Sequence, residues 1–264
     1  MNFTTKLKKI AEQNNSIVCL GMDPVLEKIP VKEQSPSKKI YEFYSNIIDA
    51  TQGQIGAVKP NYAFFAQYGF PGLRALKKII SYSKNKKIPV ILDAKRGDIG
   101  KSSAAYAKEI FEFFKADAVT ISPFMGRDSV EPFIEYCKKG KGVYILTRTS
   151  NPGAADLQDF RKTAEKVKEW YTDGVGAVVG ATNVAELSEI EGIFGGKVPM
   201  LIPGVGAQGG SAKEVAAALG NLKIHRINSS SGINYAYEKT GTDDYAKAAA
   251  EAVKKLNEEV GNLR

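Results

Sequence analysis

Short apolar runs rich in β-branched residues alternate along this chain with longer amphipathic segments. The apolar runs have the length and composition of buried strands, and the amphipathic segments repeat apolar residues every three or four positions, as helices do. The predicted strands are residues 17–21, 55–59, 89–93, 118–122, 143–147, 176–180, 200–203 and 224–228. The predicted helices are residues 37–50, 71–83, 101–115, 129–138, 160–171, 185–190, 212–218 and 244–259. Eight strands alternating with eight helices predict a closed α/β barrel.

The length of the chain fits one large domain. A (β/α)₈ TIM barrel needs about 250 residues, and the chain has 264 without a Pro/Gly/Ser-rich linker or a shift in composition. The structural alternative is a doubly wound open sheet, although no predicted strand is followed by a GxGxxG turn. We therefore expect a single-domain TIM barrel over residues 1–264.

Composition predicts a cytoplasmic protein without metal or disulfides. No apolar stretch approaches the roughly 18 residues of a membrane span, and residues 1–10 are polar and amphipathic, without a signal-peptide core. Only two cysteines occur, Cys19 and Cys137, and their spacing suits neither a disulfide framework nor a metal site. The single histidine, His225, is expected to be structural.

The formal net charge of +8 could serve nucleic acid binding or the attraction of anionic metabolites. The lysines lie along predicted helix ends and turns, without the interleaved aromatic residues of nucleic-acid modules. This distribution favours a soluble enzyme with an anionic small-molecule substrate and no nucleic acid partner.

The densest group of charges follows the third predicted strand. Side chains two apart on a strand share a face, so Asp93 and Lys95 point the same way, while Gly97 allows a turn that directs Asp98 outward. Removing such charges from water is costly unless they are paired. The group therefore serves either chemistry or an ion pair that ties down a strand end.

Polar residues also follow most of the other predicted strands, where the active sites of barrels lie. They are Asp23, Lys59, Asn61, Ser122, residues 149–151 and Gln208. Each one alone has an ordinary explanation as a helix cap or turn initiator, but their shared placement predicts an active site.

Two small-residue loops follow the seventh and eighth predicted strands, at residues 203–210 and 228–232. Glycines there permit close backbone approach and leave amide donors free, and barrels often bind phosphate at this position. A flexible turn is the alternative for either loop alone. Together they predict a phosphate site.

Five short motifs, taken in order, resemble the orotidine 5′-phosphate decarboxylase family, in particular its bacterial and protozoal-like branch, type 2. The motifs are Gly21-Met22-Asp23-Pro24, Lys59-Pro60-Asn61, the segment 93–100, Thr149-Ser150-Asn151-Pro152-Gly153 and the segment 203–208. The DxKxxD element alone also occurs in related decarboxylases and aldolases. The resemblance extends from Cys19 to about Tyr237.

The resemblance implies a homodimeric TIM-barrel enzyme that converts orotidine 5′-phosphate to UMP and CO₂ in pyrimidine synthesis, without metal or organic cofactor. It places the family's catalytic tetrad of alternating charges on Lys59, Asp93, Lys95 and Asp98, with Asp98 reaching the neighbouring subunit's site. In this interpretation Lys95 stabilises the carbanion and protonates C6, while Asp93 disfavours the substrate relative to the transition state.

The resemblance also implies a set of substrate-binding residues. Asp23 and Asn61 match positions near the ribose and the tetrad, and Ser150 matches the pyrimidine contact. Gln208 matches a phosphate contact, and the implied set is completed by Ile99, Ser102, Ser231 and Gly232. Ile99 and Ser102 would cross the subunit interface with Asp98.

One position departs from the family pattern. An arginine that pairs with phosphate normally precedes the glycine of the eighth loop, but Ser231 stands before Gly232 here. Losing a charged bidentate donor weakens phosphate binding, because one charge-assisted hydrogen bond contributes about 1.5–3 kcal/mol. Either the protein is an altered variant or another cation substitutes, and Arg226 is expected near the opposite end of the barrel.

Two alternatives remain from the sequence. One is a related Mg²⁺-dependent phosphosugar decarboxylase or aldolase with the same DxKxxD element. The other is a catalytically impaired barrel that binds nucleotides, which the serine at position 231 and the positive charge would suit.

Overall fold

The computed structural model describes residues 1–206 and 209–263, and it contains all eight predicted strands, all parallel. They are β1 (Val18–Met22), β2 (Ala57–Pro60), β3 (Ile91–Arg96), β4 (Ala118–Ile121), β5 (Gly142–Arg148), β6 (Val175–Val179), β7 (Met200–Pro203) and β8 (Arg226–Ser229). The sheet has the order β2-β1-β8-β7-β6-β5-β4-β3. Parallel bridges from Val58 to Val90 and from Asn61 to Asp93 join its two edges. The predicted TIM barrel is therefore confirmed.

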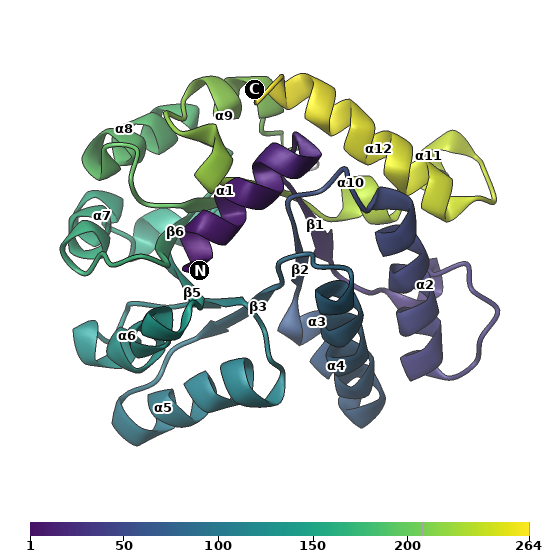
Figure 1. Ribbon diagram of the computed structural model, residues 1–264, viewed down its shortest axis with the longest axis horizontal. Helices are drawn as coiled ribbons and strands as arrows, with labels where there is room; N and C mark the ends of the chain where they lie inside the picture. Colours follow the sequence, from purple (N-terminus) through teal and green to yellow (C-terminus); the bar gives the residue numbers. More distant parts are fainter. Residues whose placement is uncertain (207–208, 264) are drawn as a thin grey trace.

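Helices surround the strands (Figure 1). The principal ones are α1 (Phe3–Asn14), α2 (Pro36–Thr51), α4 (Gly69–Asn85), α5 (Gly100–Lys108), α6 (Arg127–Ile134), α7 (Phe160–Glu169), α8 (Val184–Phe194), α9 (Ala212–Ala217) and α12 (Tyr245–Val260). Eight of these nine match the predicted helices, and α1 is the amphipathic segment at the start of the chain. The predicted helix 101–115 is divided, because α5 passes into a π-helical turn, η2 (Glu109–Phe113). The pattern did not indicate three short helices, α3 (Tyr62–Ala66), α10 (Ser231–Asn234) and α11 (Ala236–Thr240).

One end of the barrel is closed by α1, which crosses the centre of the ring of helices in Figure 1. Phe3 and Leu7 of this helix are buried against residues of the barrel interior. The fully buried Arg226, at the start of β8, donates hydrogen bonds to the carbonyl oxygens of Leu7 and Gly56 at 2.7 and 3.0 Å. Arg226 therefore lies at the closed end, as the sequence predicted, and is not the missing phosphate ligand.

The interior of the barrel is layered. Cys19, Ala57, Ile91, Ala118 and Tyr144 belong to one buried apolar cluster. Because side chains two apart on a strand share a face, the next layer toward the open end comes from residues two positions further along each strand. That layer includes Gly21, Lys59, Asp93, Thr120 and Leu146. The change from an apolar to a charged layer marks the floor of the site.

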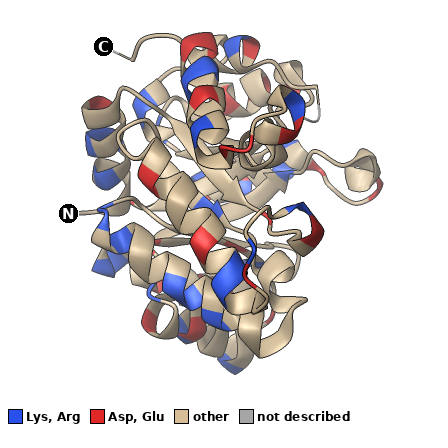
Figure 2. Ribbon diagram, turned by 90° about the vertical axis from the view of Figure 1, so that its right-hand side faces the viewer, with Lys and Arg blue, Asp and Glu red and all other residues tan. Residues whose placement is uncertain are grey.

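Charges of both signs are distributed over the helices visible in Figure 2, and neither sign forms a continuous stripe there. A surface with both signs of charge interspersed is typical of a soluble protein without a nucleic acid partner. No helix within residues 1–206 and 209–263 is long and apolar enough to cross a membrane.

Candidate active site

A cavity of about 550 Å³ opens at the carboxyl ends of the strands, and all eight strands or the loops after them contribute to its lining. Of the catalytic and substrate-binding residues that the resemblance implies, seven line it: Asp23, Lys59, Asn61, Asp93, Lys95, Ser150 and Ser231. Thr149 and Asn151, predicted from their place after the fifth strand, line it as well. Residues spread over more than two hundred positions of the sequence thus share one cavity.

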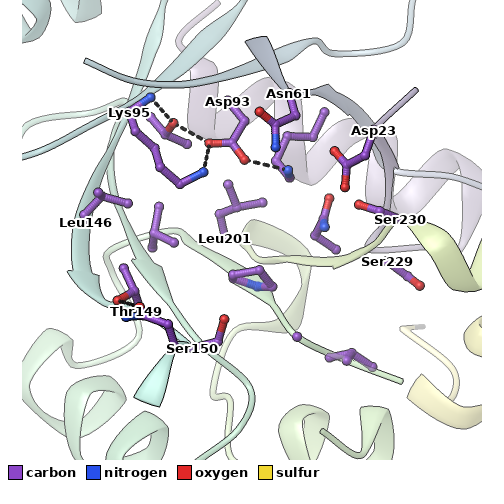
Figure 3. A pocket seen from close by; sticks show the side chains of 18 of the residues that line it. Asp23, Asn61, Asp93, Lys95, Leu146, Thr149, Ser150, Leu201, Ser229 and Ser230 are labelled. Carbon is purple, nitrogen blue, oxygen red and sulfur yellow. Dashed lines mark hydrogen bonds and ion pairs between the residues drawn. The ribbon is translucent and has the colours of Figure 1, made fainter. Parts of the chain in front are cut away.

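An ion cluster occupies one side of the cavity floor (Figure 3). The Nζ atom of Lys59 lies 2.8 Å from Oδ2 of Asp93, and the Nζ atom of Lys95 lies 2.7 Å from Oδ1 of the same carboxylate. The side chains of Lys59 and Asp93 are 5% and 9% exposed, whereas that of Lys95 is 50% exposed. The carboxylate is fixed on both oxygens, and Lys95 is the member that a ligand can reach.

The charges in this cluster keep one another ionised. Burial alone would raise the pKa of Asp93, but the ammonium charges of Lys59 and Lys95 outweigh burial and hold that pKa well below its usual range. Burial would likewise lower the pKa of Lys59, and the negative charges of Asp93 and Asp23 raise it instead. The buried groups are therefore a carboxylate and an ammonium ion at neutral pH.

Apolar side chains form the other side of the floor. Leu146, Val178 and Leu201 come from β5, β6 and β7 and line the cavity. Figure 3 shows Leu146 and Leu201 beside the ion cluster. Such a surface can bury the face of a planar ring while the charged side contacts its polar substituents. The cavity is thus divided into an apolar and a charged half.

Two buried oxygen atoms in the lining have no hydrogen-bond partner in the described chain. They are Oδ1 of Asp23 and Oδ1 of Asn228, and Asn228 is 6% exposed. An unpaired buried acceptor is costly, so these atoms are suited to hydrogen bonds from a bound ligand with hydroxyl or N–H groups. Asn61, which also lines the cavity, instead caps α3 by accepting a hydrogen bond from the amide of Ala63.

The loop after β5 holds Ser150 at the cavity wall. Thr149 is fixed by Gln158, whose amide oxygen accepts from the backbone N–H of Thr149 at 2.9 Å and whose amide nitrogen donates to its hydroxyl at 2.7 Å. A Cβ atom at Gly180 would lie 2.9 Å from the Cα atom of Ser150. The close approach of these two backbones therefore requires glycine at position 180.

The loops after β7 and β8 form the end of the cavity where phosphate was predicted. Ser229, Ser230 and Ser231 line it together with Gly204 and Val205. Gly232 lines an adjoining cavity beside α12, and Gln208 lies outside the described residues. Within the described lining the cationic side chains are Lys59 and Lys95, both held by Asp93.

The cavity of a single chain is not lined by Asp98, Ile99 or Ser102, which the resemblance assigned to a neighbouring subunit's site, nor by Ser122, which was predicted from its place after the fourth strand. The carboxylate of Asp98 accepts a hydrogen bond from the amide of Ile99 at 2.8 Å, and the side chain of Ile99 is exposed. Ser102 is exposed on the first turns of α5. Ile99 and Ser102 therefore lie on the surface of the chain, and Asp98 is partly exposed beside them.

The two cysteines are free and buried, as predicted for ordinary thiols. His225 is fully buried, and its Nδ1 atom accepts a hydrogen bond from the amide of Met200 at 3.0 Å, which supports its structural interpretation. Burial, with the nearby charge of Arg226, lowers the pKa of His225 to about 3.

Residues 1–206 and 209–263 contain no group of three or more His, Cys, Asp and Glu side chains that could hold a metal ion.

Sequence reasoning missed Thr120 and the apolar residues of the cavity floor. Thr120 and Leu146 face the cavity two positions after Ala118 and Tyr144 of the buried layer below. The alternation of faces along each strand could have identified them.

The family model described as "Orotidine 5'-phosphate decarboxylase / HUMPS family" matches residues 16–240. The chain belongs to this family. A relative from Dechloromonas aromatica (strain RCB), named orotidine 5′-phosphate decarboxylase, is 44% identical, with 96% of each chain covered. A protein of the same name from Azoarcus sp. (strain BH72) is 40% identical, with both chains covered completely.

Solved structures in this family have the same fold. The structure of Leishmania donovani OMP decarboxylase is 32% identical with a TM-score of 0.81, covering 98% of this chain and 99% of that one. A putative orotidine 5′-phosphate decarboxylase from Streptomyces avermitilis is 27% identical with a TM-score of 0.84, covering 98% and 94%. Because the family model and the relatives span nearly the whole chain, one domain accounts for the fold.

Proposed function

We infer that this protein is an orotidine 5′-phosphate decarboxylase, which releases CO₂ from orotidine 5′-phosphate and leaves UMP in pyrimidine synthesis. The observation that carries this inference is the carboxylate of Asp93 between the ammonium groups of Lys59 and Lys95, facing an apolar floor. The full-length relatives of that name support the substrate.

The chemistry requires stabilisation of negative charge on carbon. When the bond between C6 and the carboxyl carbon breaks, CO₂ leaves and its bonding electrons remain on C6, which has no adjacent electron sink. An ammonium group at C6 stabilises that charge and then transfers a proton to C6. Lys95 is the cation suited to this step, because its half-exposed side chain is the accessible member of the cluster.

The neighbouring charges prepare this step. Asp93 would face the departing carboxylate, so its charge disfavours the bound substrate more than the transition state, in which CO₂ becomes neutral. Lys59 keeps Asp93 ionised from the other side at 2.8 Å. The apolar side chains of Leu146, Val178 and Leu201 would cover the pyrimidine face and exclude water.

The proposal includes a homodimer in which Asp98 of the partner subunit completes the charge tetrad. The exposed apolar side chains of Ile99, Phe124 and Met125 support it, with 52%, 79% and 48% of their surface accessible. They lie on the loops after β3 and β4, which are adjacent, since the amide of Ser122 donates to the carbonyl oxygen of Arg96. A second chain on this surface would cover apolar area and bring Ile99 and Ser102 to a neighbouring substrate.

The remaining assignments are those that the resemblance implies, and the positions of Asp23, Asn61, Ser150 and Ser231 in the lining support them. Asp23 and Asn61 are proposed near the ribose, and Ser150 near the pyrimidine. Ser231 and Gly232, with Gln208 beyond the described residues, are proposed at the phosphate. We also propose a cytoplasmic location, which a nucleotide substrate of this kind supports.

One assay tests substrate, reaction and metal requirement together. Purified protein is mixed with orotidine 5′-phosphate, and the loss of its ultraviolet absorbance is followed with and without EDTA. We expect equal rates in both conditions and release of one CO₂ for each UMP formed. A rate abolished by EDTA and restored by Mg²⁺ would favour a phosphosugar-type enzyme, and UMP binding without turnover would favour an impaired nucleotide-binding barrel.

A further inference from the structure

The hydroxyl group of Thr120 joins the two central residues of the ion cluster. Its Oγ1 atom donates to Oδ1 of Asp93 at 2.8 Å and accepts from the backbone N–H of Lys95 at 3.0 Å. A carboxylate can only accept and a backbone amide can only donate, so the direction of both hydrogen bonds is fixed. Thr120 is 1% exposed and lines the cavity from β4.

The backbone of Lys95 requires support at this position. Its φ angle is 45°, in the left-handed region, which costs a residue other than glycine about 1 kcal/mol. The register between β3 and β4 also shifts between Leu92 and Arg96. At this shift the backbone N–H of Lys95 donates to the side-chain hydroxyl of Thr120. Backbone pairing with β4 resumes one residue later, where the N–H of Ser122 donates to the carbonyl oxygen of Arg96 at 2.7 Å.

The same hydroxyl thus fixes the backbone of one reacting residue and the carboxylate of the other. Oδ1 of Asp93 accepts from both Lys95 Nζ and Thr120 Oγ1. When Lys95 transfers its proton to C6 and becomes a neutral amine, Thr120 can still donate to Oδ1. The carboxylate then keeps its orientation through the step in which its main contact with Lys95 weakens.

We propose that Thr120 is a positioning residue for decarboxylation, which sets the geometry of Asp93 relative to Lys95. The proposal rests on the roles given to those two residues under the proposed function. In this role the hydroxyl group of Thr120 is required. In a purely structural role the methyl group of threonine would suffice, because packing does not need the hydroxyl.

The test compares Thr120→Val, which keeps the shape and removes the hydroxyl, with Thr120→Ser, which keeps the hydroxyl. Thr147→Val is the matched control, because Thr147 is equally buried on β5, donates to the carbonyl oxygen of Ile145 and does not line the cavity. We expect Thr120→Val to lower kcat about 10- to 100-fold, the effect of losing one hydrogen bond to a charged group. KM and the affinity for UMP, which has no C6 carboxylate, should change little.

Thr120→Ser should restore most of kcat, and Thr147→Val should leave it unchanged. Equal kcat for Thr120→Val and the unchanged protein would overturn the proposal, as would equal losses in the valine and serine variants. If Thr120→Val fails to fold, Thr120→Ser still decides the question, because low kcat in a serine variant with normal UMP affinity contradicts a role for the hydroxyl. Full activity of Lys95→Ala would instead overturn the proposed function. Failure of the Thr120 proposal is therefore distinguishable from failure of the proposed function.

Discussion

The ammonium group of Lys95 lies 2.7 Å from the carboxylate of Asp93, although the two residues differ five-fold in side-chain exposure. The carboxylate is buried and held on both oxygens, whereas the lysine reaches it from the open side of the cavity. This asymmetry separates a fixed charge from an accessible proton donor. It predicts that substitutions on the accessible side affect turnover more than folding.

Lys95→Ala should abolish CO₂ release and leave a folded protein that still binds UMP. The half-exposed side chain contributes little to packing, and its charge is required where negative charge develops on C6. Stopped-flow absorbance measures turnover, and titration calorimetry measures UMP binding. Lys247→Ala, which removes an exposed lysine of α12, is the control, and near-normal turnover in Lys95→Ala would contradict the assigned role.

Hybrid dimers test whether Asp98 acts in the neighbouring site. Lys95→Ala and Asp98→Ala should each be inactive as purified proteins, but mixing and reassembly should restore activity. In a mixed dimer one site carries both substitutions and the other carries neither, so about a quarter of all sites should be active. If the mixture stays inactive while native mass spectrometry shows mixed dimers, Asp98 does not act across an interface.

Ser231→Arg should lower KM for orotidine 5′-phosphate by about ten-fold or more, and kcat should not fall. The described cavity lining has no cation at the end formed by Ser229 and Ser230, and an arginine there would add a charged, bidentate donor for phosphate. Steady-state kinetics measures the change. Ser81→Arg, on the exposed face of α4, controls for added charge. An unchanged KM in Ser231→Arg would remove this position from the phosphate site.

Acid should destabilise the fold through His225, which is buried and neutral with a pKa of about 3. The unfolded chain binds a proton there at an ordinary pKa of about 6.5, so the free energy of unfolding falls by up to about 1.4 kcal/mol for each pH unit between those values. The closest carboxylate, Glu191 at 4.0 Å, has a pKa raised by burial and contributes a slope of opposite sign.

The variant His225→Asn isolates this effect, because its side-chain oxygen can replace Nδ1 as the acceptor for Met200. Urea unfolding of both proteins at pH 7.0, 5.5 and 4.5 measures the difference. We expect the variant to lose less stability than the unchanged protein as the pH falls. Parallel pH dependence in the two proteins would show that His225 does not titrate in this range.

The sequence by itself determined the elements and their order. Strands and helices have different periods of apolar residues, and a period is a local property that does not depend on the partner of each element. The same rule predicted that Asp93 and Lys95 share one face of β3. Arg226 precedes Asn228 by two residues on β8, and from this order the sequence predicted that it lies toward the opposite end of the barrel from Ser231.

The tertiary structure decided which of these residues meet. Lys59 and Asp93 are 34 residues apart and form an ion pair because the barrel closes between β2 and β3. The left-handed backbone of Lys95 and its hydrogen bond to Thr120 depend on a register shift between β3 and β4. Contacts between strands depend on closure and register, which are properties of the assembled sheet, and no pattern within a single strand encodes them.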